Sequence, residues 1–551
     1  MRIKSSGILR FFLIVASLFV GWQVGSQSTS VSDIEAAERL FGLSFNPAKR
    51  DSMLSDIAGN LKKYESLHGT SLPNNVPPAL QFNPIPWGMK VERGRSSFRM
   101  SQVAAIRRPA NIEDVAFYSV RQLAELLRTR KITSTELTKM YLNRLKKYGP
   151  KLECIITLTE DLALKQAARA DEEIRKGKYR GPLHGIPYGA KDLLAAKGYK
   201  TTWGSVPFKD QVIDEDATVI KKLEQAGAVL VAKTTLGELA WGDVWYGGMT
   251  RNPWNYKQGS SGSSAGSASA TAAGLVAFAI GSETLGSIVS PSTRCGTTGL
   301  RPTYGRVSRS GAMALSWSMD KLGPICRTVE DCAIVFNAIF GPDGKDQTVY
   351  DVPFKYDPNL TLKGVRIGYL KMAFDSVRSN KANSDSVLVV LRKLGATLVS
   401  KELPNRSVGN LSLILNAEAA AAFDELTRTG KDDIMVRQIK NAWPNAFRVA
   451  RLIPAVEYIQ ANRVRTLLIQ DMQEMMKDID VYVAPSFGEN LSVTNLTGHP
   501  CVVLPNGFTK EGTPTSISFT GQLFGEGRVL AIAKKYQDAT DFHLKHPKLE
   551  E

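Results

Sequence analysis

The sequence predicts an α/β protein with a central mixed, twisted sheet and helices on both of its faces. Amphipathic helical patterns alternate with short runs rich in β-branched residues, such as VRIGYL, ATLVS and DVYVAP, which is typical of a sheet covered by helices. Apolar residues make up 43% and charged residues 22% of the 551, the composition of a globular protein. We therefore expect a substantial buried core in one large domain or a few smaller ones.

The first 26 residues predict export from the cytoplasm. The positively charged start, MRIKSSGILR, precedes the apolar run FFLIVASLFVGWQVGS, which is the arrangement of a signal peptide. The stretch from Phe11 to Val20 is shorter than the roughly 20 apolar residues of a membrane span. Continuation through Val24 makes an uncleaved membrane tether the alternative. We expect a periplasmic or extracellular protein.

Residues 27–112 are predicted to form an irregular N-terminal extension laid over the main domain. Two weak helical patterns are followed by SLPNNVPPALQFNPIPWGM, in which the prolines prevent a long helix. We recognise no chemistry in this segment.

The main domain, expected over residues 113–546, opens with four amphipathic helical patterns. Two of them begin at pairs spaced as capping boxes, Ser119 with Gln122 and Thr133 with Glu136. The other two are expected over residues 161–176 and 216–226, the latter leading into the apolar strand pattern AVLVA. Such helix and strand units build the predicted sheet.

The charge and the metal-binding residue types argue against several function classes. The net charge of +17 is scattered, with no run of five basic residues and no RNA-binding or zinc-finger pattern, so we expect no nucleic-acid partner. The five cysteines are dispersed and odd in number, which disfavours a disulfide framework. The five histidines form no HExxH motif, so the sequence gives little support for a metal site.

An unusual segment rich in glycine and serine covers residues 258–299, QGSSGSSAGSASATAAGLVAFAIGSETLGSIVSPSTRCGTTG. Such a composition often marks a flexible linker. Here it leads directly into an apolar stretch over residues 270–281, which a solvated linker would not do. Small residues instead allow a backbone to approach a ligand closely and to present N–H groups to an anion.

Residues 262–266 also fit the GxSxG nucleophile elbow, which would make Ser264 a nucleophile. An elbow follows a buried strand and needs a later histidine as its base. The preceding residues, RNPWNYKQGS, do not read as a buried strand. The sequence therefore disfavours this hypothesis.

With so few histidines, a hydrolase would need another base, and a buried lysine can serve because desolvation lowers its pKa. Lys191 is the candidate, in GPLHGIPYGAKDLL, where a turn shaped by glycine and proline meets an apolar stretch. The alternative is a surface lysine paired with Asp192, which the residues by themselves favour.

Three segments, in this order, resemble the amidase-signature family, which includes fatty acid amide hydrolase, peptide amidase and the A subunit of glutamyl-tRNA amidotransferase. They are GIPYGAKD, MTRNPWNYKQGSSGSSAGSASATAAG and IGSETLGSIVSPSTRCGTTGLRPTYGRVSRSG. The resemblance covers Tyr118 to about His546. It implies the amidase-signature fold for this domain.

By this resemblance the catalytic triad is Lys191, Ser263 and Ser287, and Ser263 follows a cis peptide. Neutral Lys191 would take a proton from Ser263, which would take one from Ser287, whose Oγ attacks the amide carbonyl to form an acyl-enzyme. No metal or cofactor is needed. The oxyanion would be bound by the backbone N–H groups of Thr284, Leu285, Gly286 and Ser287.

The chain departs from the family pattern near the nucleophile. The family sequence Asp-Thr-Gly-Gly-Ser-Ile-Arg is replaced by residues 283–289, ETLGSIV, and GGSSGGS by residues 261–267, SGSSAGS. Leu285 therefore stands where a glycine is expected, and Val289 where an arginine is expected. A positive φ at Leu285 would strain the backbone and disturb the oxyanion hole.

The resemblance predicts an exported amidase that acts on a small-molecule or peptide carboxamide. The alternatives are a glutaminase like the A subunit of the amidotransferase, in a cytoplasmic complex, and a catalytically silent binding protein on the same scaffold. The export signal argues against the cytoplasmic complex. Aromatic residues near the motifs are candidates for the substrate pocket, namely Trp241, Trp245, Tyr246 and Trp317.

Overall fold

A computed structural model describes residues 29–549 and divides into two compact units, residues 1–73 and 74–551. The described part of the first unit contains α1 (Val31–Phe41) and α2 (Pro47–His68). An ion pair of 2.8 Å between Arg50 and Glu38 joins these two helices. The predicted signal segment, residues 1–26, lies outside the described residues. Among the helices that are described, none is long and apolar enough to cross a membrane.

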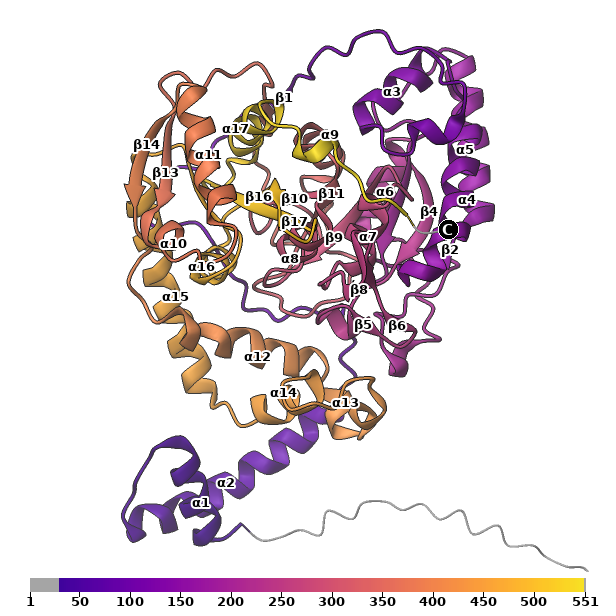
Figure 1. The fold of residues 1–551 in the computed structure, drawn as a ribbon. Coiled ribbons are helices and arrows are strands. Elements are labelled where there is room, and N and C mark those ends of the chain that lie inside the picture. Colours follow the sequence, from indigo (N-terminus) through magenta and orange to yellow (C-terminus); the bar gives the residue numbers. More distant parts are fainter. Residues whose placement is uncertain (1–28, 550–551) are drawn as a thin grey trace, which may run out of the picture. The chain divides into compact units, whose positions relative to one another are not determined.

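A mixed sheet forms the centre of the second unit, as predicted (Figure 1). In the described residues it has eleven strands, with parallel and antiparallel neighbours. From one edge to the other their order is β14 (Thr397–Lys401), β13 (Arg366–Leu370), β15 (Val481–Pro485), β17 (Pro514–Gly521), β16 (Cys501–Phe508), β10 (Thr298–Arg301), β11 (Lys321–Cys326), β9 (Phe278–Glu283), β3 (Pro187–Lys191), β4 (Val229–Thr234) and β2 (Ile155–Leu158).

Helices cover both faces of this sheet. The helices that carry most of the packing are α3 (Val120–Arg128), α4 (Ser134–Leu152), α5 (Glu160–Arg175), α6 (Thr218–Gln225), α7 (Ala265–Ala272), α8 (Val289–Cys295), α9 (Val329–Ile339), α11 (Lys381–Lys393), α15 (Ala455–Met476), α16 (Glu489–Thr497) and α17 (Glu526–Asp538). Along β16, Val502 packs in the main core with residues of α17, whereas Val503 packs with Val289 of α8. Because successive side chains of a strand point to opposite faces, α8 and α17 cover opposite faces.

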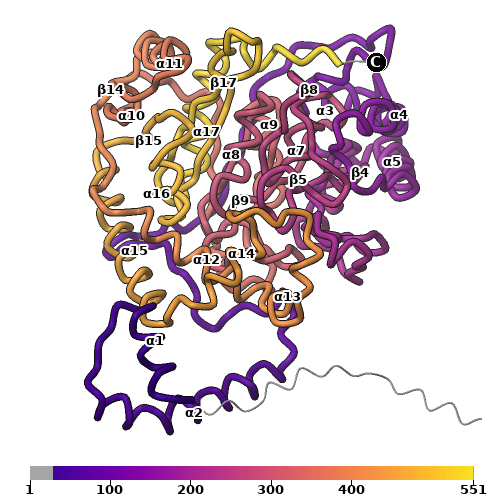
Figure 2. Tube along the Cα trace, turned by 60° about the horizontal axis from the view of Figure 1, so that its bottom comes forward, coloured from indigo at the N-terminus to yellow at the C-terminus, as the bar shows by residue number. Residues whose placement is uncertain are grey.

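The two edges of the sheet carry different helices. Helices α4 and α5 pack on each other and on β4 at one edge, and α11 packs beside β14 at the other, as both views show (Figure 2). Shorter helices and strands complete the unit: α10 (Lys371–Asp375), α12 (Ser412–Ala422), α13 (Asp424–Arg428), α14 (Trp443–Ala450), β5 (Val244–Trp245), β6 (Gly248–Met249), β7 (Arg251–Asn252), β8 (Asn255–Gly259) and β12 (Lys355–Tyr356).

The local signals in the sequence are confirmed where they mark helix starts. Both capping boxes are present, at Ser119 before α3 and at Thr133 before α4. The helices expected over residues 161–176 and 216–226 are α5 and α6, each shifted by no more than two residues at either end.

The two weak helical patterns of the extension correspond to α1 and α2. Residues 74–112, by contrast, belong to the same compact unit as the main domain. Pairing contributes to this, because β1 (Ser97–Phe98) forms a parallel pair with β12. The structural boundary therefore follows Pro73 instead of residue 112.

Candidate active site

Two parallel neighbours in the sheet bring the first site residues together. Strands β3 and β9 pair with Ala190 opposite Ile280, so Lys191 and Ser282 emerge at the same edge. Lys191 Nζ lies 2.8 Å from Ser282 Oγ. The carboxyl ends of neighbouring parallel strands are a common location for binding sites.

Ser263 reaches the same lysine from the glycine-rich loop before α7. The Gly262–Ser263 peptide bond is cis, and Lys191 Nζ lies 2.8 Å from Ser263 Oγ. Every residue of α7 is buried, so this segment is part of the core and the linker interpretation is wrong. Close packing requires glycine at position 281, where a Cβ atom would lie 2.8 Å from Ser264 Oγ.

Ser264 is bonded in a way that does not suit a nucleophile. Its Oγ accepts from the N–H of Ser282 at 3.1 Å and donates to the Ser282 carbonyl at 3.0 Å. The side chain is fully buried. These bonds tie α7 to β9, which is a structural role, and Lys191 Nζ also donates to Ser264 Oγ at 3.1 Å.

Lys191 is completely buried, so the surface ion pair with Asp192 is not formed. Asp192 instead pairs with Lys233 at 2.6 Å, and both side chains are inaccessible to solvent. Burial lowers the pKa of Lys191 to about 7, although Asp320 and Glu283 act in the opposite direction. A lysine with this pKa is partly a neutral amine at neutral pH, which is the form a general base requires.

Ser287 lies in the loop between β9 and α8. Its carbonyl oxygen accepts a hydrogen bond of 3.1 Å from the N–H of Ser264, which holds this residue beside the Ser263 loop. The Ser287 hydroxyl makes no hydrogen bond to any residue that the structure describes, and 7% of the residue is exposed. Among the described residues, the structure therefore joins Lys191 to Ser263 but shows no hydrogen bond between the hydroxyls of Ser263 and Ser287.

The loop before Ser287 offers unused donors. Within residues 29–549, no hydrogen bond engages the backbone N–H groups of residues 284–287. The positive φ of this loop, 85°, is at Gly286, and Leu285 is not among the residues with positive φ. Leu285 thus avoids the strain considered above, because the left-handed conformation falls on the glycine that follows it.

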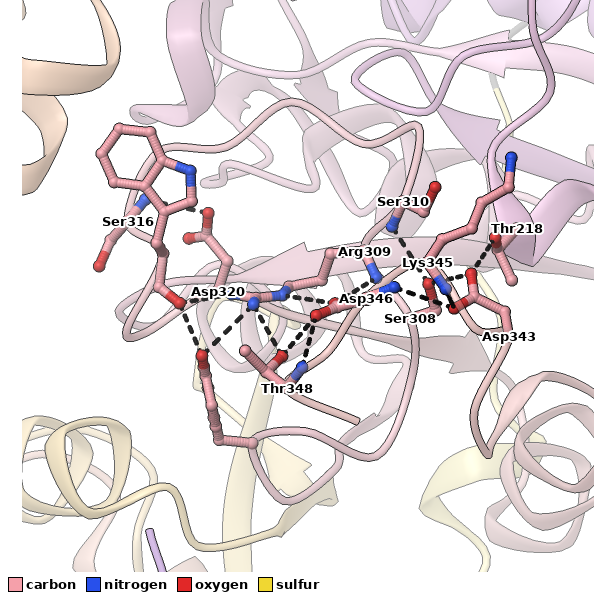
Figure 3. A network of polar contacts seen from close by, with 12 residues as sticks. Thr218, Ser308, Arg309, Ser310, Ser316, Asp320, Asp343, Lys345, Asp346 and Thr348 are labelled. Atoms are coloured by element: carbon pink, nitrogen blue, oxygen red, sulfur yellow. Dashed lines mark hydrogen bonds and ion pairs between the residues drawn. The ribbon is translucent and has the colours of Figure 1, made fainter. Parts of the chain in front are cut away.

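A cavity of about 460 Å³ reaches Ser282 and Thr284. On one wall Arg309 donates to Asp346, Thr348, Tyr304 and the Trp317 carbonyl (Figure 3). Asp320 accepts from Thr284 Oγ1 at 2.5 Å and from the N–H groups of Leu315 and Ser316. Burial raises the pKa of Asp320.

Of the aromatic residues proposed for the pocket, Trp317 lines this cavity. Trp241, Trp245 and Tyr246 do not. Trp245 is buried and packs edge-on against Tyr246 at 4.9 Å, so its role is in packing.

Comparison with known proteins identifies the family of this chain. The family model Amidase matches residues 136–491. The chain belongs to the amidase-signature family. It is 35% identical to the A subunit of the glutamyl-tRNA(Gln) amidotransferase of Marinomonas sp. (strain MWYL1), over 78% of this chain and 98% of that protein. The corresponding protein of Carboxydothermus hydrogenoformans is 34% identical over 79% and 100%.

Solved structures lead to the same family. The native peptide amidase of Stenotrophomonas maltophilia superposes with a TM-score of 0.72 at 31% identity, covering 80% of this chain and all of that one. An amidase family protein from Bacillus anthracis str. Ames has a TM-score of 0.72 at 28% identity, covering 80% and 94%. The family assignment makes this chain an amide C–N hydrolase.

The amidase loop that carries Ser287 is held by Glu283, a residue that the sequence reasoning did not use. Its carboxylate accepts from the N–H groups of Ile288 and Val289 and from Arg301 at 2.7 Å. Burial by itself would raise the pKa of Glu283, but the Arg301 pairing lowers it to about 2. Val289, where an arginine was expected, is buried beside Cys501.

Ser282 is the second residue that the sequence reasoning missed. Its hydroxyl and carbonyl both face Lys191, at 2.8 and 3.5 Å. The only sequence signal is its place in IGSETLGS, five residues before Ser287. Recognising its contact would have required the pairing of β3 with β9.

Proposed function

We propose that this amidase cleaves a carboxamide with Ser287 as the nucleophile and with Ser263 and Lys191 as its proton relay. The observation that carries the proposal is the fully buried Lys191 amine, 2.8 Å from Ser263 Oγ. The neighbouring hydrogen bond between Ser264 and Ser287 supports it by holding the two serine loops together.

Acylation begins with Lys191 as the neutral amine. Its lone pair accepts the Ser263 proton while Ser263 accepts the Ser287 proton, and Ser287 Oγ attacks the carbonyl carbon. The free N–H groups of residues 284–287 stabilise the resulting oxyanion, each contributing on the order of 3 kcal/mol. The relay returns a proton to the leaving nitrogen as the C–N bond breaks, which leaves an acyl-enzyme.

Deacylation uses the same relay in the same direction, with water in place of Ser287 as the nucleophile and Ser287 in place of the amine as the leaving group. Water loses a proton through Ser263 to Lys191 and attacks the acyl carbonyl. The tetrahedral intermediate collapses, the Ser287 oxygen recovers its proton, and the carboxylic acid leaves.

The substrate proposed first is a small-molecule or peptide amide. The superposition on a peptide amidase at 31% identity supports this class. A second candidate is a glutaminase role like that of the A subunit of an amidotransferase, which the 35% identity over almost the whole of such a protein favours.

The test is ammonia release by the purified chain from a panel of peptide amides, simple primary amides and glutamine. We expect release from peptide or simple amides, its loss in Ser287→Ala and Lys191→Met, and fluorophosphonate labelling that depends on Ser287. Ser290→Ala is the matched control, since within residues 29–549 its hydroxyl bonds to Ser261 alone. Ammonia from glutamine alone would favour the second candidate. Unchanged activity in Ser287→Ala would refute the triad, and no turnover or labelling would favour a silent binding protein.

We also propose that residues 1–26 direct export of this amidase, on the charged and apolar pattern of the sequence. Fractionation of expressing cells would test this. The full chain should be found outside the cytoplasm and a chain starting at residue 27 inside it, and equal distributions would contradict the proposal.

A further inference from the structure

Residues 74–82, which precede the family domain, are fixed at their first residue by two side-chain hydrogen bonds of Asn74, here called the Asn74 clip. Asn74 Oδ1 accepts from the N–H of Ala314 at 2.6 Å, and Asn74 Nδ2 donates to the Ala314 carbonyl at 2.8 Å. Ala314 itself lines the cavity beside the active site. The clip therefore joins the start of this segment to the cavity wall.

The other end of the segment is anchored by packing. The Phe82 ring lies edge-on to Tyr304 at 5.0 Å, and the buried Arg465 guanidinium sits 3.5 Å from its centroid. Pro84 is buried, and Asn83 accepts a hydrogen bond of 2.9 Å from Tyr350. Both ends of residues 74–82 are thus held in the second unit.

Between these anchors the chain forms part of the cavity lining. Pro77 and Pro78 restrict the backbone here, because a proline ring fixes φ. The segment's lining residues are Asn74, Asn75, Pro77, Pro78, Ala79 and Gln81. Leu80 is not among them and is 84% exposed. Ala79 and Leu80 are adjacent and both exposed, but only Ala79 also borders the cavity.

The buried part of the remaining lining suits a neutral, apolar group, while the charged residues Glu215 and Lys345 lie on its more exposed part. Its buried residues include Leu193, Met313, Leu315 and Leu322. The buried charges are already engaged, since Arg309 makes four hydrogen bonds and Asp320 accepts three. Burying a further charge against such a wall would be costly.

We propose that residues 74–81 form a wall of the cavity for the acyl part of the substrate, so that this segment sets the upper size of the acyl group and favours neutral, apolar ones. This inference rests on the proposed function. The segment precedes residue 136, where the family model begins, so the selectivity belongs to this chain's own extension.

The test compares Ala79→Trp with Leu80→Trp in the full chain. The substrates are acetamide and a primary amide with a large apolar acyl group, such as N-acetylphenylalaninamide. Since both release ammonia, they differ only in the acyl part. Ala79→Trp should lower kcat/KM for the large amide at least tenfold and for acetamide less than threefold. Leu80→Trp, one residue away and outside the cavity lining, should change neither by more than threefold.

Release of the Asn74 clip gives the opposite expectation. Asn74→Ala loses both bonds to Ala314, so the wall loosens and the ratio of kcat/KM for a bulkier amide to that for acetamide should rise. If Ala79→Trp and Leu80→Trp changed kcat/KM equally, or if Ala79→Trp lowered it equally for both amides, the proposed role of residues 74–81 would be wrong. The proposed function would still stand, provided that activity depended on Ser287. If wild-type turnover survived Ser287→Ala, the proposed function itself would fail instead.

Discussion

At the residue scale, burial of Lys191 predicts how activity depends on pH. Its pKa, lowered from 10.5 to about 7 by burial, means that the neutral base is lost as the pH falls through this value. With a neutral amide, kcat/KM should fall roughly tenfold per pH unit below the pKa and level off above it. A profile of initial rates from about pH 5 to 9 measures this, and a flat acid side would contradict the role of Lys191 as the base.

The same burial affects stability in a defined direction. Between the folded pKa of about 7 and the ordinary value of 10.5, the unfolded chain binds more protons at this lysine than the folded one. The contribution of Lys191 to stability therefore rises with pH across this window.

Gly286 is the residue whose replacement should most directly disturb the loop of residues 284–287, whose free N–H groups are proposed to bind the oxyanion. Its φ is 85°, and a Cβ atom would lie 3.0 Å from Leu491 Cδ2. Gly286→Ala should lower kcat on the order of 100-fold by displacing the N–H donors. Steady-state kinetics measures this, with Gly430→Ala as the control, because Gly430 has a φ of 69° and open space around it.

Adding Leu491→Ala to Gly286→Ala separates the effect of the steric contact with Leu491 from the effect of the positive φ. The double variant removes the steric contact but keeps the unfavourable φ, which costs about 1 to 2 kcal/mol. Recovery should therefore be partial. Wild-type kcat in Gly286→Ala would show that the loop conformation is unimportant for catalysis.

The triad positions were predicted from a family resemblance, and residue patterns by themselves gave the wrong preference for Lys191. A lysine beside an aspartate in the sequence suggests a surface pair, yet Asp192 is taken by Lys233 of the neighbouring strand β4. Partners 41 positions apart depend on strand pairing, which no local pattern shows.

At the element scale, the buried pair of Glu283 and Arg301 joins the end of β9 to the start of α8 and to the loop that follows α16. Both side chains are fully buried, and Arg301 also donates to the His499 carbonyl at 3.0 Å. Arg301→Met should lower the free energy of unfolding by about 3 to 5 kcal/mol, because it leaves a buried carboxylate without its cation.

Urea unfolding measures this loss, and Arg169→Met provides the control. Arg169 pairs with Glu224 at 3.0 Å, but both side chains are more than 40% exposed, so its loss should cost less than about 1 kcal/mol. In the wild type, the Glu283 contribution is present above its ordinary pKa of 4.5 and is lost as the pH falls toward 2. Equal losses in both variants would contradict the importance of burial.

Elements with local signals were predicted well, and those that depend on distant partners were not. Helices α3 and α4 start where their capping boxes indicate. The order of the strands, by contrast, places β16 beside β10, although these two strands are about 200 positions apart in the sequence. The prolines of the extension correctly excluded a long helix there, but its pairing with β12 had no signal in the sequence.

At the scale of the whole molecule, the division after Pro73 predicts which part of the chain catalysis needs. The proposed triad, the proposed oxyanion-binding loop of residues 284–287 and every residue that lines the cavity belong to the second unit, residues 74–551. A chain beginning at Ser71 keeps the Asn74 clip and should retain kcat/KM within about threefold, with the same ratio of kcat/KM between N-acetylphenylalaninamide and acetamide. Kinetics and thermal unfolding of this chain beside the full one measure both properties. A loss of more than tenfold with unfolding unchanged would mean that α1 and α2 contribute to turnover, because such a result separates a catalytic requirement from a requirement for folding.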